Sequence, residues 1–168
     1  MEDELTDKSV IETKSQSLAV LSLKDGSLIK IYENSIIELI HSDKAGMIIS
    51  LIKGSLRFAT NQEFKKFYPY LIHTPNSDYV IRNAVFFYQI ITQGDTFKSQ
   101  NEDLFYPPVE AKEYACICRG MIDFLTEDLK RVFQTTTAKY HNAFFVVEKG
   151  KYLPAPILNH NVGFDLLG

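Results

Sequence analysis

A phrase of apolar residues interrupted by one glycine occurs twice in this chain, and it constrains the fold more than any other feature. The first copy covers residues 48–58 (IISLIKGSLRF), and the second covers residues 114–124 (YACICRGMIDF). In both copies a basic residue precedes the glycine, and an apolar and an aromatic residue follow it at alternate positions. A glycine between two short apolar strands marks a bend, a bulge or a close approach of two backbones. The repetition therefore predicts an all-β domain built from two related halves.

Short apolar runs follow one another about every ten residues in the first part of the chain. They cover 18–23, 28–32, 36–40 and 47–52, and turn residues such as the Asp-Gly pair at 25–26 separate them. This spacing is typical of a β-sandwich or a β-barrel. Helix is the competing interpretation of such runs, but their β-branched residues and the turn residues between them favour strands.

The chain is long enough for one domain with a core of its own. We expect a mobile polar tail at 1–16, followed by a single domain at 17–168. Within that domain the two halves are expected at about 17–91 and 113–168. The polar stretch 92–112 is long for a compact domain, so it is either a functional loop or the link between the halves.

One segment reads as a short helix, near 61–68 (NQEFKKFY). Asn61 is a suitable N-cap, and Pro69 is a helix stop. Phe64 and Phe67 fall on one face of this helix, which predicts that the helix is pinned to the core.

Charge and hydropathy restrict the classes of partner. The chain carries 18 basic and 21 acidic residues, a formal net charge of −3, so no positive field attracts nucleic acid or an anionic membrane. No apolar run reaches the roughly 18 residues that a membrane span requires. The opening residues 1–7 (MEDELTD) are acidic, unlike a signal peptide. Either the protein is cytoplasmic, or a leader has been removed.

Three segments of the first half follow the pattern of a known family. They are 53–58 (KGSLRF), 68–75 (YPYLIHTP) and 80–86 (VIRNAVF). A glycine followed by alternating apolar residues, then Pro-aromatic-x-apolar-x-Thr-Pro, then a further strand resembles the FecR domain, over roughly residues 18 to 150. The sequence departs from the family at 83–84, where Asn-Ala stands in place of the usual Gly-Thr.

Segments of the second half are similar to a smaller FecR-like subgroup. They are 116–120 (CICRG), 140–143 (YHNA) and 154–160 (PAPILNH). The subgroup has Cys-x-Cys-x-Gly, His-His and Pro-Ala-Pro-x-x-Asn-His elements at these places. Tyr140 replaces the first histidine of the pair, which weakens an inherited two-histidine site.

The resemblance implies an antiparallel β-sandwich of jelly-roll type at the bacterial envelope, usually in the periplasm. Better-known members relay a signal from an outer-membrane receptor to a sigma factor through a membrane span and an N-terminal cytoplasmic segment. Neither of these is visible in the sequence, so the relay role is not carried over. The function expected is a non-enzymatic binding or regulatory domain that acts through a partner protein or a small ligand.

The two cysteines and two of the histidines suggest an alternative function. Cys116 and Cys118 are two residues apart on an expected strand, so their Cα atoms are roughly 6.6 Å apart and their side chains are parallel. A disulfide needs Cβ atoms about 3.8 Å apart, so none is expected between them. His141 and His160 fall within the subgroup resemblance, and thiolates with imidazoles suit zinc or copper. The alternative is a metal-binding protein or metal-dependent enzyme with these four ligands. Otherwise the cysteines are small buried hydrophobes and no cofactor is expected.

Candidate contact residues for a ligand or partner are Tyr106, Tyr114 and Tyr152, together with His141 and His160. The tyrosines lie near expected loops, where they serve equally well to cap the core. No common catalytic or nucleotide-binding motif occurs, so an enzyme is not expected. A third hypothesis is a structural domain that forms a homodimer through an edge strand.

Overall fold

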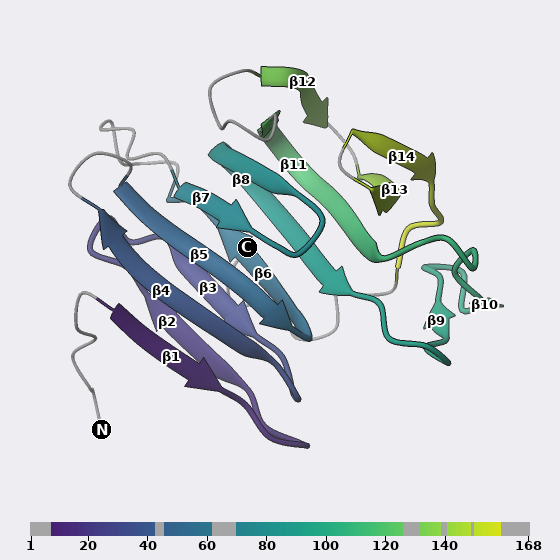
Figure 1. The fold of residues 1–168 in the computed structure, drawn as a ribbon, viewed down its shortest axis with the longest axis horizontal. Helices are drawn as coiled ribbons and strands as arrows, with labels where there is room; N and C mark the ends of the chain where they lie inside the picture. The colour runs from purple at the N-terminus through teal and green to yellow at the C-terminus, as the bar shows by residue number, and fades with distance from the viewer. Residues whose placement is uncertain are drawn as a thin grey trace.

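The computed structural model of the protein describes residues 8–42, 46–61, 70–125, 132–138, 141–148 and 150–158. Within these ranges the chain forms fourteen β-strands and no helix (Figure 1). The strands are Lys8–Glu12 (β1), Ala19–Ser22 (β2), Leu28–Ile31 (β3), Ile36–Ser42 (β4), Gly46–Lys53 (β5), Ser55–Ala59 (β6), Tyr70–His73 (β7), Asp78–Ile90 (β8), Phe97–Lys98 (β9), Leu104–Phe105 (β10), Glu113–Leu125 (β11), Val132–Ala138 (β12), Asn142–Glu148 (β13) and Lys151–Pro154 (β14). The all-β class predicted from the sequence is confirmed.

Two long strands, β8 and β11, form the centre of the sheet and pair antiparallel along nearly their whole length. Each of these two strands has a second edge, and two shorter strands pair along different parts of that edge. On β8, residues 78–81 pair with β7 and residues 85–89 pair with β6. On β11, residues 113–117 pair with β13 and residues 120–125 pair with β12. Both central strands therefore change partners part-way along.

This change of partners divides the sheet into two branches beside β8. The first branch runs β7-β5-β4-β1, and the second branch runs β6-β3-β2. In Figure 1, β4 and β5 of the first branch lie in front of β2 and β3 of the second. Side chains of both branches fill one core between them, where Phe58 of β6 and Tyr70 of β7 have ring centroids 4.8 Å apart. Burial of this apolar surface is the main force that holds the branches together.

The strands pair antiparallel, as expected for a sandwich, with one departure. Strands β5 and β7 are parallel, with Ile49 beside Ile72. After β5 the chain enters the second branch as β6 and then returns to the first branch as β7, so β7 runs in the same direction as β5. The sequence prediction of wholly antiparallel pairing is therefore wrong at this place. The jelly-roll order and the division into two halves stay predictions.

The two glycines of the repeated phrase have the same backbone conformation. Gly54 lies between β5 and β6, at the step from the first branch to the second, and has φ of 84°. Gly120 lies where β11 passes from its β13 partner to its β12 partner, and has φ of 86°. A Cβ atom on Gly120 would lie 1.8 Å from the carbonyl oxygen of Asn83 on β8. The bend and the close approach predicted from the repeated phrase are both present.

A second cluster of buried residues lies apart from the main core, over β8, β11 and β13. It includes Tyr114, Phe145 and Phe97 together with Leu158. The segment 92–112, which carries the small β9–β10 sheet, supplies part of this cluster. The chain near the C-terminus supplies another part, held by hydrogen bonds between the Tyr114 hydroxyl and the backbone of Pro156 and Leu158. The long polar loop of the sequence prediction thus covers a face of the sheet.

Residues 8–12 differ from the sequence prediction, which placed them in a mobile tail. They form β1, which pairs antiparallel with β4, and the half-buried Ile11 packs against the main core. The alternation of exposed and half-buried residues along β1 is the period-two pattern of an edge strand. The helix predicted near 61–68 lies almost entirely outside the described residues. The described part of the chain contains no helix of the length and apolarity that a membrane crossing requires.

Candidate functional site

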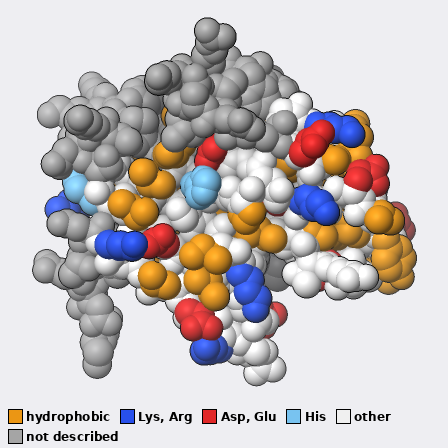
Figure 2. Space-filling model, in the orientation of Figure 1, with side chains coloured by type: hydrophobic (Ala, Val, Ile, Leu, Met, Phe, Trp, Pro, Cys, Tyr) orange, Lys and Arg blue, Asp and Glu red, His pale blue; other side chains and the backbone are white. Residues whose placement is uncertain are grey.

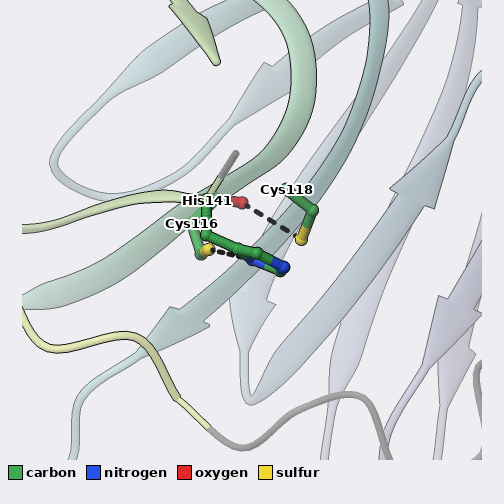
Figure 3. A group of neighbouring side chains, drawn as sticks. All are labelled: Cys116, Cys118 and His141. Atoms are coloured by element: carbon green, nitrogen blue, oxygen red, sulfur yellow. Dashed lines mark hydrogen bonds between the residues drawn. The ribbon is translucent and has the colours of Figure 1, made fainter. Parts of the chain in front are cut away.

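Three of the four predicted metal ligands lie close together, two on one face of β11 and the third just before β13 (Figure 3). Cys116 and Cys118 alternate along β11, so their side chains point the same way. Cys116 is opposite Ala143 in the β11–β13 pairing, which places His141, just before β13, beside Cys118. The Cys116 Sγ atom is 3.4 Å from Nδ1 of His141. The two sulfur atoms and a ring nitrogen all lie within 4.8 Å of one another.

The fourth predicted ligand, His160, lies outside the described residues. Both cysteines carry thiols and form no disulfide, as their spacing predicted. Cys116 is buried, whereas Cys118 and His141 are half-buried. The Cys118 thiol, through hydrogen bonding, and burial raise the pKa of Cys116, so its thiol stays protonated unless a cation approaches.

A buried basic side chain lies beside these thiols. The pairing of β3, β6, β8 and β11 places Lys30, Arg57, Phe87 and Cys116 in one row across the sheet. Arg57 is only 9% exposed. Burial lowers the pKa of the Arg57 guanidinium, and the electrostatic effect of Cys118 opposes that shift. The positive charge of Arg57 therefore lies within electrostatic reach of both thiols.

A cleft of about 830 Å³ opens next to this row. It lies between the loop 92–98 and the β5–β6 corner, and its walls include Tyr32, Phe87 and Phe97. Tyr32 and Phe87 meet edge to face, with ring centroids 5.6 Å apart. None of the three residues of the cysteine–histidine group lines the cleft. The cleft and the group are thus separate features that share Phe87 as a neighbour.

A buried carboxylate forms a second polar site, which the sequence analysis missed. Glu113 is fully buried at the start of β11 and accepts hydrogen bonds from Thr74 Oγ1 at 3.0 Å, from the backbone and side chain of Asn76, and from Tyr88. The Tyr79 hydroxyl lies 3.0 Å from that of Tyr88. Burial raises the pKa of Glu113, and these donors only partly offset the shift. The carboxylate ties β8 and β11 to the turn at 74–77.

The signal for Glu113 in the sequence is one acidic residue at the head of an otherwise apolar strand. Its partner Thr74 belongs to the Thr-Pro element at 74–75. Nothing in the sequence links these two residues, which lie 39 positions apart. Arg57 was missed for a similar reason, since it alternates with Leu56 and Phe58 in a strand that reads as an ordinary half-buried one.

The tyrosines predicted as contact residues do not converge. Tyr106 is 74% exposed, whereas Tyr114 is fully buried in the second cluster. Tyr152 is half-buried against the main core, where it packs on Phe124 and Phe144. Among these three, only Tyr106 presents most of its surface to a partner.

An apolar row crosses the outer face of the first branch. The register of the strands places Ile40, Ile48, Leu71 and Val80 side by side on β4, β5, β7 and β8. All four side chains are half-buried, and they point away from the core because their neighbours in each strand point into it. We call these four residues the outer apolar row.

Polar side chains border the outer apolar row. The adjacent register positions carry Glu38, Ser50, His73 and Asp78, with Nδ1 of His73 2.5 Å from Oδ1 of Asp78. Figure 2 shows the molecule from this side, with hydrophobic side chains set among charged ones over β4, β5 and β7. The face therefore has an apolar row with a polar border along one side, and an apolar patch beside polar residues is common in protein interfaces.

Residues 9–100 of the chain match the family described as FecR protein, and this segment is more than half of the chain. The chain belongs to the FecR family. The resemblance to the FecR domain is therefore confirmed, whereas the elements of the smaller subgroup lie outside the matched segment. The segment matched to the FecR family includes β8 and all strands of both branches except the first residue of β1, but it ends before β11, so the cysteine–histidine group lies outside it.

Two crystal structures of a candidate anti-sigma factor from Parabacteroides distasonis have a similar fold. Their TM-scores are 0.60 and 0.61, with 12% sequence identity in both cases. The alignments cover 96% and 95% of this FecR-family chain, but only 65% of each of the other chains. At this identity the likeness concerns the fold alone. No curated protein matches the chain in sequence.

Proposed function

We propose that this chain is a non-enzymatic regulatory domain of the bacterial envelope that acts by binding a partner protein. The outer apolar row carries the proposal. Membership of the FecR family and a fold shared with a candidate anti-sigma factor both favour a role in signalling. Signalling of that kind requires a specific protein contact, and the outer face of the first branch is suited to one.

The chemistry of this face favours a protein over a small ligand. Four apolar side chains on four neighbouring strands make a shallow surface, whereas small molecules prefer concave sites. Paired strands hold the row in place, so little conformational freedom is lost when a partner binds. The partner expected is a protein segment with an apolar centre and polar flanks that complement Glu38, His73 and Asp78.

The buried charged groups favour a structural role over catalysis. Glu113 is tied to four donors, and Asp123 of β11 accepts a hydrogen bond from Arg82 Nε at 2.5 Å. These groups link neighbouring strands, and neither Glu113 nor Asp123 lines the 830 Å³ cleft. We therefore expect no turnover from the purified domain.

The test begins with a photocrosslinking amino acid placed at Leu71, in the full-length protein expressed in its own bacterium. The same amino acid at Leu104, which is 69% exposed on β10, is the matched control. The protein crosslinked at Leu71 is identified, produced separately and titrated against the unlabelled domain. We expect Leu71→Lys to weaken that binding by at least tenfold, about 1.4 kcal/mol, and Leu104→Lys to leave it unchanged.

Circular dichroism and thermal melting of both lysine variants establish that each is folded. Equal crosslinking from the two positions, or an affinity that Leu71→Lys does not change, overturns the proposed surface. Crosslinks only to a second copy of the chain overturn the regulatory reading in favour of self-assembly. The envelope location is tested by whether protease added to spheroplasts degrades the full-length protein, and protection contradicts it.

A further inference from the structure

We propose that Cys116, Cys118 and His141 form a binding site for a thiophilic metal ion, zinc(II) or copper(I). The site lies on the face of β11 that carries the second cluster, away from the outer apolar row. It goes beyond the proposed function, since no step of partner binding requires it.

The distances between the ligand atoms fit a single ion. A tetrahedral ion with metal–sulfur bonds of about 2.3 Å and metal–nitrogen bonds of about 2.0 Å holds its sulfur and nitrogen ligands about 3.5 Å apart. The Cys116 Sγ to His141 Nδ1 distance is already 3.4 Å. All three ligand atoms lie within 4.8 Å of one another, so side-chain rotation alone brings the remaining pairs to coordination distance.

The sheet preorganises these ligands. Cys116 and Cys118 alternate on β11, the central strand with the longest pairing, and His141 enters from the neighbouring β13 through the register Cys116–Ala143. Figure 3 shows the three side chains converging from these two segments. Two cysteines at this spacing cannot bridge each other as a disulfide, but both can bind one ion between them.

The charges and softness of the ligands select the class of metal. Two thiolates and an imidazole favour zinc(II) or copper(I) over magnesium or calcium, which prefer oxygen ligands. Two thiolates neutralise zinc(II), and they leave one negative charge on copper(I) that the nearby Arg57 complements. Cys118 and His141 are half-buried, so the ion has an open side for one further ligand.

The experiment uses the whole chain prepared without a histidine tag and fully reduced under anaerobic conditions. Zinc(II), copper(I) and magnesium(II) are each added at one equivalent, unbound ion is removed, and the retained metal is measured by mass spectrometry. Affinity follows from competition with a chromophoric chelator for each ion. We expect one retained ion of zinc(II) or copper(I) per chain, no retained magnesium(II), and a higher melting temperature with the retained ion.

Three variants test the ligand assignment. Cys118→Ser and His141→Ala each remove one ligand, and His41→Ala removes an exposed histidine at the end of β4 as the matched control. Loss of a direct ligand should weaken binding by at least the roughly 10- to 100-fold that loss of a supporting contact costs. The control should bind as the unaltered chain does.

The absorption spectrum of the cobalt(II)-loaded chain separates metal binding from a purely structural role of the cysteines, because thiolate-to-metal bands appear only when sulfur coordinates the ion. Failure of the chain to retain either ion overturns the site. Equal affinity in Cys118→Ser, His141→Ala and the control also overturns it. Thermal melting of each variant without metal shows whether that variant is folded. A loss of metal affinity in a folded variant is then due to the loss of the metal-ligating side chain.

Discussion

Replacing Gly120 by alanine tests the close approach of β11 to β8, at the point where β11 passes from β13 to β12. Gly120 has φ of 86°, a conformation that costs a residue with a Cβ atom about 1–2 kcal/mol. In addition, the new Cβ would lie 1.8 Å from the Asn83 carbonyl oxygen and 2.6 Å from the Ala84 Cα. Both of these are backbone atoms of β8, so relief requires the β8–β11 pair to separate locally. Overpacking of this kind lowers stability by a further ~1–3 kcal/mol.

The matched control is Gly94→Ala. Gly94 has φ of 90°, but a Cβ atom there would meet nothing within 4 Å. Gly94→Ala should therefore lose only the backbone contribution to stability, about 1–2 kcal/mol. The expected free energy of unfolding falls by about 2–5 kcal/mol in Gly120→Ala, a large part of the stability of a typical domain.

Equilibrium urea unfolding followed by circular dichroism measures both variants. Tyrosine fluorescence serves as a second probe, because the chain has nine tyrosines and no tryptophan. Coincident transitions justify a two-state treatment. If Gly120→Ala loses no more stability than Gly94→Ala, the close approach of the two backbones does not stabilise the fold, and the reasoning is refuted.

Three further outcomes follow from the packing and hydrogen bonds described. Gly54→Ala should destabilise the fold as strongly as Gly120→Ala, because the added Cβ atom would lie 2.1 Å from Ser35 Oγ and 2.6 Å from Ser35 Cα. A loss of stability no larger than that of Gly94→Ala in the same urea assay would contradict this. Thr13→Val should lower the free energy of unfolding by about 1–3 kcal/mol, because Thr13 Oγ1 donates to the Tyr32 carbonyl at 2.5 Å and accepts from the Ser35 amide at 2.9 Å. Thr92→Val, at an exposed position, is the control and should leave the melting temperature nearly unchanged. Because burial raises the pKa of Glu113 in the folded state, its contribution to stability is fully present below the unfolded pKa of about 4.3 and is lost as pH rises through the raised folded pKa. Glu113→Gln should flatten the fall in stability above about pH 4.3, and an unchanged slope there would show that the raised pKa of this carboxyl does not contribute.

The sequence predicted those parts of the fold that depend on local pattern. Turn residues between apolar runs located β2 to β5, and the repeated phrase located the bends at Gly54 and Gly120. The short β1 was not predicted, because only Val10 and Ile11 in it are apolar and its place is set by pairing with the distant β4. The parallel β5–β7 pair was not predicted either, since it depends on the excursion of β6 into the other branch.

The site was predicted to a similar extent. The alternation of Cys116 and Cys118 placed both thiols on one face, and the alternative hypothesis of a cysteine–histidine cluster included His141, which the structure places beside them. The tyrosines were not separable by sequence, because a tyrosine near a loop looks the same whether it caps a core or faces solvent. Glu113 depends on contacts with residues 25 to 39 positions away, which no local pattern reveals.

The sharing of β8 and β11 between neighbours on both sides has a consequence for dissection of this domain. A fragment that stops where the FecR match stops, at residue 100, would keep both branches but leave one entire edge of β8 without a strand beside it. Such an edge is a template for aggregation. The end of the segment that matches the FecR family is thus not the end of the folded unit. Shorter versions designed from it should precipitate, whereas those that keep the chain through β14 should remain monodisperse.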